Sequence, residues 1–433
     1  MKKIITAAAV AAMAAGSVFA TEAKITLNYR TKLDAFAQST VKTKGSDDVI
    51  TKEWMDWEGY DGAGKQVAAN SSDTFKFVLD GDNAGATLAL NMNTNASSYT
   101  LNQYSAWMKW AIGNGTLKLE SGNWKDGYAD GAYRVKKDVD AQNAEGVDFE
   151  KFKLGSIFAD NQISFVDNLG GSNKALSSFA EYSMPVNDDI NLSVLLGGIY
   201  NKFDEIKDDD TTTYYDSYLV SRVKLGYADL FDAEFIYKKP AKHDNVFGLY
   251  VMPKVLDGLT LNIGGAFDLY DKDGSDYKDW GFDLRARYQA SSALSVSFFT
   301  NVSGTDLDAG RIIAGGIVGR KGAYGYAYAK DGTTAVANNS KFKTAMWNNL
   351  SARYKINDLI TATMNVGLIT PLSKIDDDDT SYGPEWRVTP AVQVYAASNA
   401  SIWAGVALSG VSVESGDFSV FSVEVPVVFR VKM

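Results

Sequence analysis

Few residues of this 433-residue chain have the types and spacing that catalysis or cofactor binding requires. Residues 59–66 (GYDGAGKQ) carry the glycines and the lysine of a phosphate-binding loop, but the segment is one residue short, and Gln66 replaces the hydroxyl that would hold Mg²⁺. His243 is the only histidine, and nothing else in the sequence supports a serine–histidine arrangement around it. We interpret both features as parts of polar surface loops and predict that the chain is not an enzyme.

Acidic clusters are the other candidates for ligand chemistry. Asp271, Asp273 and Asp276 lie in one predicted loop, but Phe282 stands where an EF-hand loop needs a glutamate. The chain has no cysteine, which excludes thiolate metal sites and disulfides. We therefore expect no cofactor and no dedicated metal site, while calcium bridging by this loop or by the aspartates of 376–379 stays open.

Many of the remaining charged residues fall at alternate positions in segments where every other residue is apolar. In 280–288, Asp283, Arg285 and Arg287 alternate with aromatic and aliphatic side chains. In 421–433 every odd position is apolar. Because successive side chains of a strand point to opposite faces, this alternation predicts strands with one apolar and one polar face.

Most of these segments are paired across short connections rich in Asn, Asp, Gly and Pro, which is typical of hairpins. The predicted pairs are 73–80 with 86–93, 101–112 with 116–122, 174–184 with 190–200, 214–226 with 231–239, 245–252 with 259–268, 278–289 with 293–303, 343–356 with 359–369, and 386–397 with 400–409. Adding 24–31 and 420–432 gives a best estimate of eighteen strands, within a range of sixteen to twenty. Pro390 and Pro426 fall inside two of these strands, where each removes a hydrogen-bond donor, and we expect a local bulge at each.

Long polar connections separate the hairpins, and the largest are 32–72, 124–173 and 304–342. Short turns at one end and long loops at the other are typical of outer-membrane barrels, whereas a compact soluble domain rarely needs several loops of this length. A sheet that crosses hydrocarbon must close on itself, because its backbone groups find no other partners there. We predict an all-β fold, a transmembrane antiparallel up-and-down β-barrel over residues 21–433.

The N-terminus indicates export. Lys2 and Lys3 precede an apolar stretch at 4–15, and Val18-Phe19-Ala20 has the small residues of a cleavage site. Residues 1–20 therefore read as a cleaved signal peptide, too short to span a membrane. The net charge of −10 argues against nucleic-acid binding. Together with the predicted barrel, this favours export by the Sec route to a bacterial outer membrane.

If the apolar face of the barrel meets lipid, the polar face lines its interior. The resulting pore-lining candidates are Lys109, Lys118, Glu120, Arg222, Lys224, Asp283, Arg285, Arg287, Arg353, Lys355 and Arg387. Basic residues outnumber acidic ones on this face although the chain is acidic, so the loops must carry most of the negative charge. Since charged rings set ion preference in wide pores, this surplus predicts anion preference. The alternative, that some of these residues sit at the periplasmic rim and select nothing, stays open.

The chain resembles bacterial outer-membrane porins, and in its hairpins it is similar to porin-like outer-membrane proteins of spirochaetes. The segments that carry the resemblance are the signal peptide, the C-terminal strand FSVFSVEVPVVFRVKM, and hairpins such as YSAWMKWAIGNGTLKLESGNW and GLYVMPKVLDGLTLNIGGAFD. The resemblance implies assembly by the outer-membrane insertion machinery, which recognises a last strand that normally ends in Phe. Here the last residue is Met433, and Phe429 is the nearest aromatic on the same face.

These features favour a porin that forms a water-filled channel for passive diffusion of small hydrophilic solutes or ions. Its expected partners are the lipid bilayer of the outer membrane, the insertion machinery, the solutes and, as an option, further copies of the chain in a homotrimer. One alternative is a surface-exposed adhesin or structural protein that uses the barrel as an anchor. Another is a secreted soluble β protein. The solute, the oligomeric state and the loop that constricts the lumen stay open.

Overall fold

The computed structural model describes residues 22–57, 74–93, 98–123, 176–207, 210–239, 245–272, 275–306, 311–312, 327–328, 335–336, 341–374, 384–412 and 418–433. Several features predicted above lie outside the described residues: the signal peptide, the phosphate-loop-like segment 59–66, loop 124–173, His243, Asp273 and the aspartates of 376–379.

The described residues form β-strands and the connections between them. In this part of the chain no helix is long and apolar enough to cross a membrane. The strands are β1 (Glu22–Thr43), β2 (Val49–Trp57), β3 (Thr74–Asp80), β4 (Ala84–Asn93), β5 (Ser98–Ile112), β6 (Gly115–Asn123), β7 (Leu176–Pro185), β8 (Ile190–Lys207), β9 (Asp210–Tyr227), β10 (Phe231–Lys239), β11 (Asn245–Pro253), β12 (Leu259–Lys272), β13 (Ser275–Gln289), β14 (Leu294–Thr305), β15 (Arg311–Ile312), β16 (Ala327–Tyr328), β17 (Ala335–Val336), β18 (Lys341–Lys355), β19 (Ile360–Lys374), β20 (Glu385–Ala397), β21 (Ala400–Gly405), β22 (Ala407–Ser412) and β23 (Phe418–Lys432).

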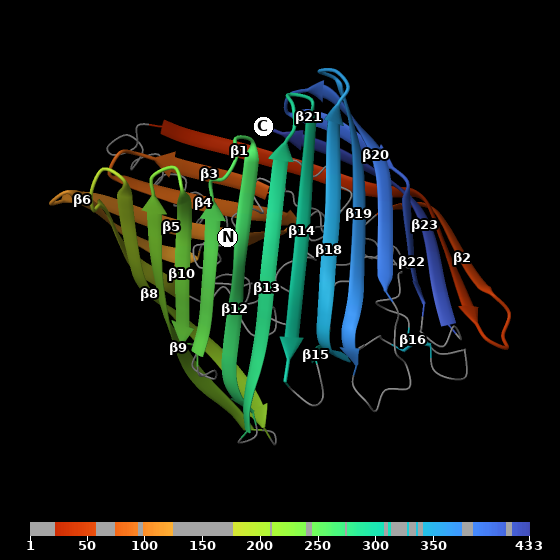
Figure 1. Ribbon diagram of the computed structural model, residues 1–433, viewed down its shortest axis with the longest axis horizontal. Helices are drawn as coiled ribbons and strands as arrows, with labels where there is room; N and C mark the ends of the chain where they lie inside the picture. The colour runs from red at the N-terminus through yellow and green to blue at the C-terminus, as the bar shows by residue number, and fades with distance from the viewer. Residues whose placement is uncertain are drawn as a thin grey trace.

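Short connections join consecutive strands at one end of the sheet, which we call the turn side. It lies uppermost for β7 to β20 in Figure 1. At 186–189, the side-chain oxygen of Asn187 accepts the backbone N–H groups of Asp189 and Ile190 at 2.9 and 2.8 Å. Asn357 does the same in the turn before β19, with both distances 2.9 Å. This local bonding is the physical reason why asparagine marks these turns.

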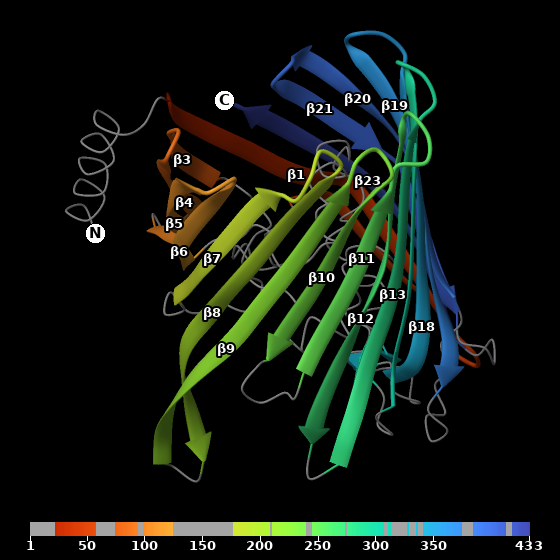
Figure 2. The same cartoon turned by 60° about the vertical axis from the view of Figure 1, so that its left-hand side comes forward.

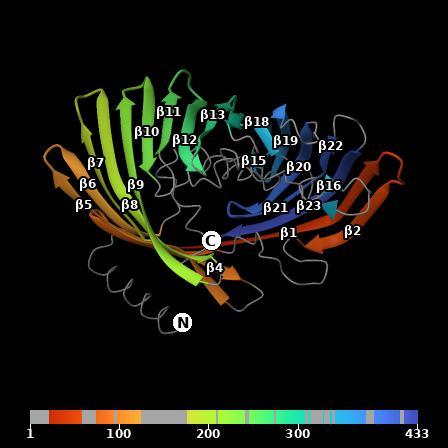
Figure 3. The same cartoon turned by 90° about the horizontal axis from the view of Figure 1, so that it is seen from below.

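The antiparallel pairings form a ring. Each strand from β3 to β14 pairs with the next, and the ring continues through β18, β19, β20, the β21–β22 segment and β23. β1 closes it, because its residues 22–28 pair with β3 and its residues 28–43 pair with β23. Leu27 and Met433 exchange two backbone hydrogen bonds at this seam, of 2.7 and 2.8 Å. Figure 2 shows β1 crossing from beside β3 to beside β23, and Figure 3 shows β1 beside β23 and β2.

The ring has fewer positions than the sheet has strands. Of the 21 strands in the sheet, β2 pairs only with β1 and β15 only with β18. β21 and β22 share one register with β20 and act as a single interrupted strand. Within the described ranges this leaves eighteen positions around the ring.

The structure corrects two of the predicted loops. β1 continues to Thr43 and β2 covers Val49–Trp57, so much of the segment 32–72 is strand rather than loop. The reason is tertiary: the second half of β1 is held between β23 on one side and β2 on the other. In the segment 304–342, both ends belong to β14 and β18, and the short β15 adds a pairing to β18.

The two prolines inside strands differ from each other. At Pro426 the β1–β23 pairing shifts register between Asp34 and Ala37, which is the bulge expected there. At Pro390 the expected bulge is wrong, since β20 keeps one register with β21 and β22. The N–H of Val406 donates to the Pro390 carbonyl at 3.0 Å, but Pro390 has no N–H to return. The missing bond falls where β21 and β22 are separated.

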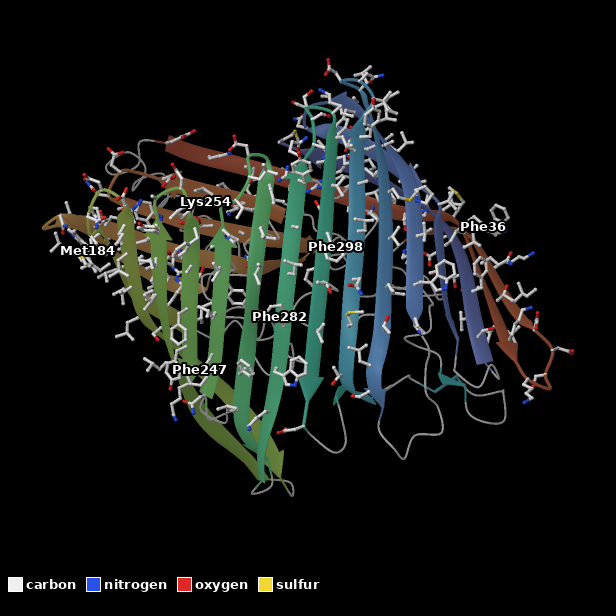
Figure 4. The ribbon with its side chains drawn as sticks, in the orientation of Figure 1. Phe36, Met184, Phe247, Lys254, Phe282 and Phe298 are labelled. Atoms are coloured by element: carbon white, nitrogen blue, oxygen red, sulfur yellow. The ribbon has the colours of Figure 1, made fainter. Side chains whose placement is uncertain are left out.

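The two faces of the sheet have the reverse polarity of a soluble protein. On the outer face, Leu249, Phe282 and Phe298 are 55%, 52% and 37% exposed, and Figure 4 shows both phenylalanines on the outside of the curved sheet. On the other face, which we call the inner face, polar side chains are buried. These include Glu120, Glu181, Arg222, Glu234, Asn262, Asn349, Thr363, Asn365, Thr389, Gln393, Ser409, Ser422 and Glu424. The sheet therefore presents hydrocarbon outward and polar groups inward.

Candidate functional site

Cross-strand pairing places the predicted pore-lining residues on the inner face. The pairing of β5 with β6 sets Lys109 opposite Lys118, and the pairing of β6 with β7 sets Lys118 opposite Glu181. Pairing from strand to strand around the ring shows which alternate positions of each strand share this face. These positions include all the candidates named from the sequence: Lys109, Lys118, Glu120, Arg222, Lys224, Asp283, Arg285, Arg287, Arg353, Lys355 and Arg387.

Six of the inner-face residues on β6, β7, β9 and β10 form what we call the charged cluster. Its members are Lys118, Glu120, Glu181, Arg222, Lys224 and Glu234. They come from strands far apart in the chain, and cross-strand register alone brings them together. Acids and bases are equal in number, so the cluster as a whole is neutral.

Arg222 is the centre of the charged cluster. Its guanidinium lies 2.6 Å from Glu181 Oε1 and 3.6 Å from Glu234 Oε1, and the Arg222 side chain is only 1% exposed. The Ser193 hydroxyl donates to the same Glu181 oxygen at 2.7 Å, and Lys224 Nζ lies 4.0 Å from it. Burying an unpaired charge is expensive, and these partners offset that cost. Arg222 is therefore a structural ion-pair residue of the wall.

Aromatic side chains contact several cations of the inner face. Lys109 Nζ lies 4.4 Å from the ring centre of Trp107, and Lys118 Nζ lies 5.9 Å from the same ring. Lys118 also pairs with Glu120 at 2.5 Å. On β13, the Arg285 guanidinium stands 4.7 Å from the Phe299 ring centre. Such contacts fix the direction of a cation while leaving its charge in place.

The opposite part of the ring carries uncharged polar residues, which we call the neutral cluster. Its members are Thr361, Thr363, Asn365, Thr389, Gln393 and Ser401, all buried on β19 to β21. Trp403 is fully buried among them, packs with Ala391 and Val428, and points its Nε1 toward Thr363 Oγ1 at 3.4 Å. Gln393 Nε2 donates to Ser401 Oγ at 3.0 Å.

Two of the predicted arginines border the neutral cluster. Arg353 donates to the Tyr395 hydroxyl at 2.5 Å, and that hydroxyl donates to Gln393 Oε1 at 2.8 Å. Arg387, nearer the other end of β20, pairs with Glu424 of β23 at 2.9 Å. The charge of Arg387 is thereby offset by an acid, and the Arg353 guanidinium is held by the Tyr395 hydroxyl.

Sequence reasoning missed two parts of this face. Glu181 is absent from the predicted pore-lining residues, although it alternates with Ala180, Tyr182 and other residues of the outer face, so the period-two signal was present. The neutral cluster was missed because hydroxyl and amide side chains also fill turns and loops. Only their burial in the folded sheet distinguishes them.

Aromatic side chains pack closely on glycines of neighbouring strands. A Cβ atom at Gly264 would lie 1.9 Å from the Tyr250 ring, and Tyr250 is 2% exposed. A Cβ atom at Gly85 would lie 2.5 Å from the Trp107 ring. Only glycine allows these rings to lie flat on the neighbouring strand.

The turn side also carries paired charge. Lys355 Nζ lies 2.6 Å from Asp358 Oδ1 in the turn between β18 and β19. The hydrogen bond from Lys355, followed by its positive charge, lowers the pKa of the Asp358 carboxyl below its usual value. Lys355 is thus offset by an exposed turn residue outside the inner face.

The predicted acidic loop is wrong for two of its three aspartates. Asp271 belongs to β12 and Asp276 to β13, where they lie directly opposite each other, because the pairing of these two strands continues to Lys272 and Ser275. Within the described ranges, no group of three or more His, Cys, Asp or Glu side chains is placed to hold a metal ion.

Comparison with known proteins gives structural likeness only. No protein-family model matches the chain. No curated protein matches it either. Among solved structures, Pseudomonas aeruginosa OpdO aligns over 96% of this chain and 98% of its own length, with 9% identity and a TM-score of 0.49. An anion-selective porin from Comamonas acidovorans covers 94% of this chain and 100% of its own, with 13% identity and a TM-score of 0.46.

A third similar structure is the outer membrane channel DcaP of Acinetobacter baumannii. It covers 94% of this chain and 97% of its own length, with 11% identity and a TM-score of 0.41. With identities this low, function has to be inferred from the geometry of the chain itself.

Proposed function

We propose that the chain is a porin of a bacterial outer membrane, whose ring of strands encloses a water-filled channel for small hydrophilic solutes and ions. The observation that carries this proposal is the reversed polarity of a ring that closes on itself. Exposed side chains such as Leu249 and Phe282 face outward, while Arg222 and Glu234 are buried on the inner face.

Hydrocarbon is the solvent in which this arrangement is favourable. Each Å² of apolar surface kept in water costs about 25 cal/mol, so an outer face of this composition is unfavourable in water. Lipid removes that cost and requires every backbone group to be paired within the sheet, which ring closure through β1 and β23 achieves. A polar interior then supplies a path for solutes without any covalent step.

Solute preference follows from the inner face. We propose that Lys109, Lys118, Glu120, Arg222, Lys224, Asp283, Arg285, Arg287, Arg353, Lys355 and Arg387 line or support this path. Arg285 and Arg287 lie on one strand, and their directly paired cross-strand neighbours are Asn262, Thr260, Phe299 and Ser297. Basic residues outnumber acidic ones among these candidates. This favours anions over cations.

Single-channel conductance in planar bilayers tests the proposal. Protein extracted from outer membranes in detergent should give open steps of fixed size in KCl. Folded protein that gives no steps would contradict the proposal and would favour the alternative, a surface adhesin or structural protein with the barrel as its anchor.

Reversal potentials under a salt gradient test the solute preference separately. The unaltered protein should prefer anions, and Arg285→Glu with Arg287→Glu should reduce or reverse that preference. Cation preference in the unaltered protein would contradict the basic-lumen proposal while leaving the channel itself intact.

Export and assembly belong to the same proposal. We propose that residues 1–20 are removed after Sec export and that the last strand, ending at Met433, is recognised by the outer-membrane insertion machinery. We further propose a homotrimer. The intact mass of the purified protein tests the first point, since it should match a chain beginning at Thr21, and light scattering in detergent tests the last.

A further inference from the structure

Three neighbouring turns on the turn side form one continuous surface. They are the connections from β7 to β8 (186–189), from β9 to β10 (228–230) and from β11 to β12 (254–258). The Ala228 N–H donates to the Asp189 carbonyl at 2.6 Å, and the Lys254 N–H donates to the Leu230 carbonyl at 2.8 Å. Figure 4 shows Lys254 at this end of the sheet. Hydrogen bonds therefore join each of the three turns to the next.

Each of these turns exposes large aliphatic side chains. Val186, Leu230, Val255 and Leu256 are all more than half exposed. Single exposed aliphatic residues are common on protein surfaces, whereas a contiguous group of them is typical of an interaction surface. The next turn along the ring, residues 290–293, is the contrast, because it consists of alanine and serine alone.

The same three turns are acidic. Their exposed aspartates are Asp188, Asp189, Asp229 and Asp257, and Lys254 is the one cation within them. The Lys254 ammonium lies 3.3 Å from Asp232 of β10, so its charge is offset there. We call the exposed aliphatic and acidic residues of these turns the turn-side rim: Val186, Asp188, Asp189, Asp229, Leu230, Val255, Leu256 and Asp257.

Nearby cations of the inner face do not belong to the turn-side rim. Lys224 of β9 lies 4.0 Å from Glu181, and Arg287 lies in the inner-face phase of β13.

The shape of the rim is fixed by its own backbone. The Val186 N–H donates to the Ile190 carbonyl at 2.7 Å, and the Leu259 N–H donates to the Leu256 carbonyl at 3.1 Å. A surface that is already held in one conformation loses little conformational entropy when a partner binds.

We propose that the turn-side rim is a docking surface for a periplasmic partner that presents basic and aliphatic side chains together. The periplasmic position rests on the proposed outer-membrane function, because the short turns of such barrels face the periplasm. The aspartates would pair with lysines or arginines of the partner, and the aliphatic side chains beside them would leave water.

Charge argues against the two other occupants of such a surface. Inserting Leu230 or Leu256 into the bilayer would carry the adjacent Asp229 and Asp257 carboxylates toward hydrocarbon, where an unpaired charge is costly. A second copy of the chain would bring the same acidic residues face to face, which is repulsive. A basic partner gains from both the aliphatic and the acidic residues of the rim.

Binding of synthetic peptides tests the proposal. The full-length mature protein, in nanodiscs of zwitterionic lipid, is titrated into a fluorescent peptide of alternating lysine and leucine, with empty nanodiscs as the blank. This peptide should bind more tightly than a glutamate–leucine or a lysine–serine peptide. Its affinity should fall when salt rises from about 0.1 M to about 1 M, because the Debye length shortens from about 10 Å to about 3 Å. Equal binding of the glutamate–leucine peptide would overturn the proposal.

Charge variants assign the binding to the rim. Asp229→Asn with Asp257→Asn should weaken binding of the lysine–leucine peptide about fivefold. The matched control is Asp47→Asn with Asp48→Asn, which removes the same charge from the exposed connection between β1 and β2 and should leave the affinity unchanged. If the first pair prevents folding, Asp257→Asn alone should still weaken binding about twofold. Affinity that is the same in all these variants would overturn the proposal.

Aliphatic variants test the other half of the surface. Leu230→Ser with Leu256→Ser should weaken binding of the lysine–leucine peptide about tenfold and leave binding of the lysine–serine peptide nearly unchanged. An equal loss for both peptides would mean that the leucines do not contact the partner, and would overturn the aliphatic part of the proposal.

Two measurements distinguish the proposal from its competitors. Leu256→Cys provides a single thiol, because the chain has no cysteine of its own. A fluorescent label there should not be quenched by lipids that carry a quencher in their acyl chains, and light scattering should give the same mass for the rim variants as for the unaltered protein. Quenching would overturn the proposal in favour of bilayer insertion, and a lower mass would overturn it in favour of self-association.

Single-channel conductance separates this proposal from the channel function. The rim variants should keep the open steps of the unaltered protein, since the rim lies outside the inner face. Normal steps without peptide binding would overturn the docking surface and leave the porin function standing. Peptide binding by a folded protein that gives no steps would support the docking surface and overturn the porin function.

Discussion

The charged cluster and the neutral cluster are two parts of one inner face that are stabilised in different ways. In the charged cluster, Arg222 is buried by pairing with Glu181 and Glu234 across neighbouring strands. In the neutral cluster, Trp403 is buried by packing, and the polar groups around it make uncharged hydrogen bonds. The difference shows two ways of burying polar side chains on the inner face: pairing opposite charges, or using uncharged groups that hydrogen-bond to each other.

The comparison also separates residues that support the wall from residues that we propose act on solutes. Arg222 and Arg387 are paired with acids and largely buried, so replacing them should alter stability more than selectivity. Arg287 and Arg353 are partly exposed near the turn side, so replacing them should alter selectivity more than stability. Each prediction below tests one side of this division.

Removing the indole side chain of Trp403, which fills the neutral cluster, should have the largest effect on stability. Trp403 is 0% exposed, so Trp403→Ala leaves a cavity and should lower the free energy of unfolding by about 4 kcal/mol. Urea unfolding in detergent micelles, followed by tryptophan fluorescence of the other tryptophans, measures it. Trp403→Phe is the control and should lose much less. A small effect of the alanine variant would mean that packing does not hold this wall.

Breaking the charged cluster should come next. Glu234→Ala takes one acid from Arg222 and leaves the guanidinium buried beside Glu181 alone, which should cost about 3 kcal/mol. The triple variant Glu181→Leu, Glu234→Leu and Arg222→Met should recover much of the loss, since none of the three paired charges then remains. If the single variant is as stable as the unaltered protein, the ion pairs do not stabilise the wall.

A polar deletion in the neutral cluster should cost less. Gln393→Ala removes the hydrogen bonds to Ser401 and Tyr395 and should lower the free energy of unfolding by about 1 kcal/mol. The same unfolding experiment measures it, with Ser295→Ala as a second polar deletion on this face. A loss equal to that of Glu234→Ala would remove the distinction between the two clusters.

The smallest effect is expected at the turn side, where Asp358 is exposed. Hydrogen bonding by Lys355 lowers the pKa of this carboxyl, so its contribution to stability is present above the pKa of an unfolded aspartate and is lost as pH falls through the lowered folded pKa. Carboxyl titration by NMR should show the lowered pKa, and Lys355→Met should return it toward its usual value. A carboxyl whose pKa does not respond to Lys355→Met would contradict this pairing.

Much of the fold could be predicted because its signals are local. The period-two alternation of β13 placed Asp283, Arg285 and Arg287 on one face before any pairing was known, and the register of β12 to β14 confirms that phase. The hairpin turns were equally predictable, since Asn187 and Asn357 form their hydrogen bonds within three residues. Neither signal depends on distant parts of the chain.

Other features could not be read from local pattern. The extension of β1 to Thr43 depends on pairing with β23, which is distant in the chain. Ser39 and Ser422, for example, lie opposite each other although they are 383 residues apart. The unshifted register at Pro390 depends on the strands on either side, which hold it in place despite the missing donor. Both required knowledge of which strand lies next to which.

The sequence by itself determined the phase of each strand, the position of the short turns and the surplus of positive charge on the polar face. Strand phase and turn chemistry are set by neighbours within a few residues, so composition and spacing were sufficient. Only the tertiary structure decided which of those charges meet. Arg222 and Glu181 are 41 residues apart in the chain, and cross-strand register brings them to 2.6 Å. That register separates buried, paired cations such as Arg222 from partly exposed cations such as Arg287, because a charge is offset only by the neighbours that folding gives it.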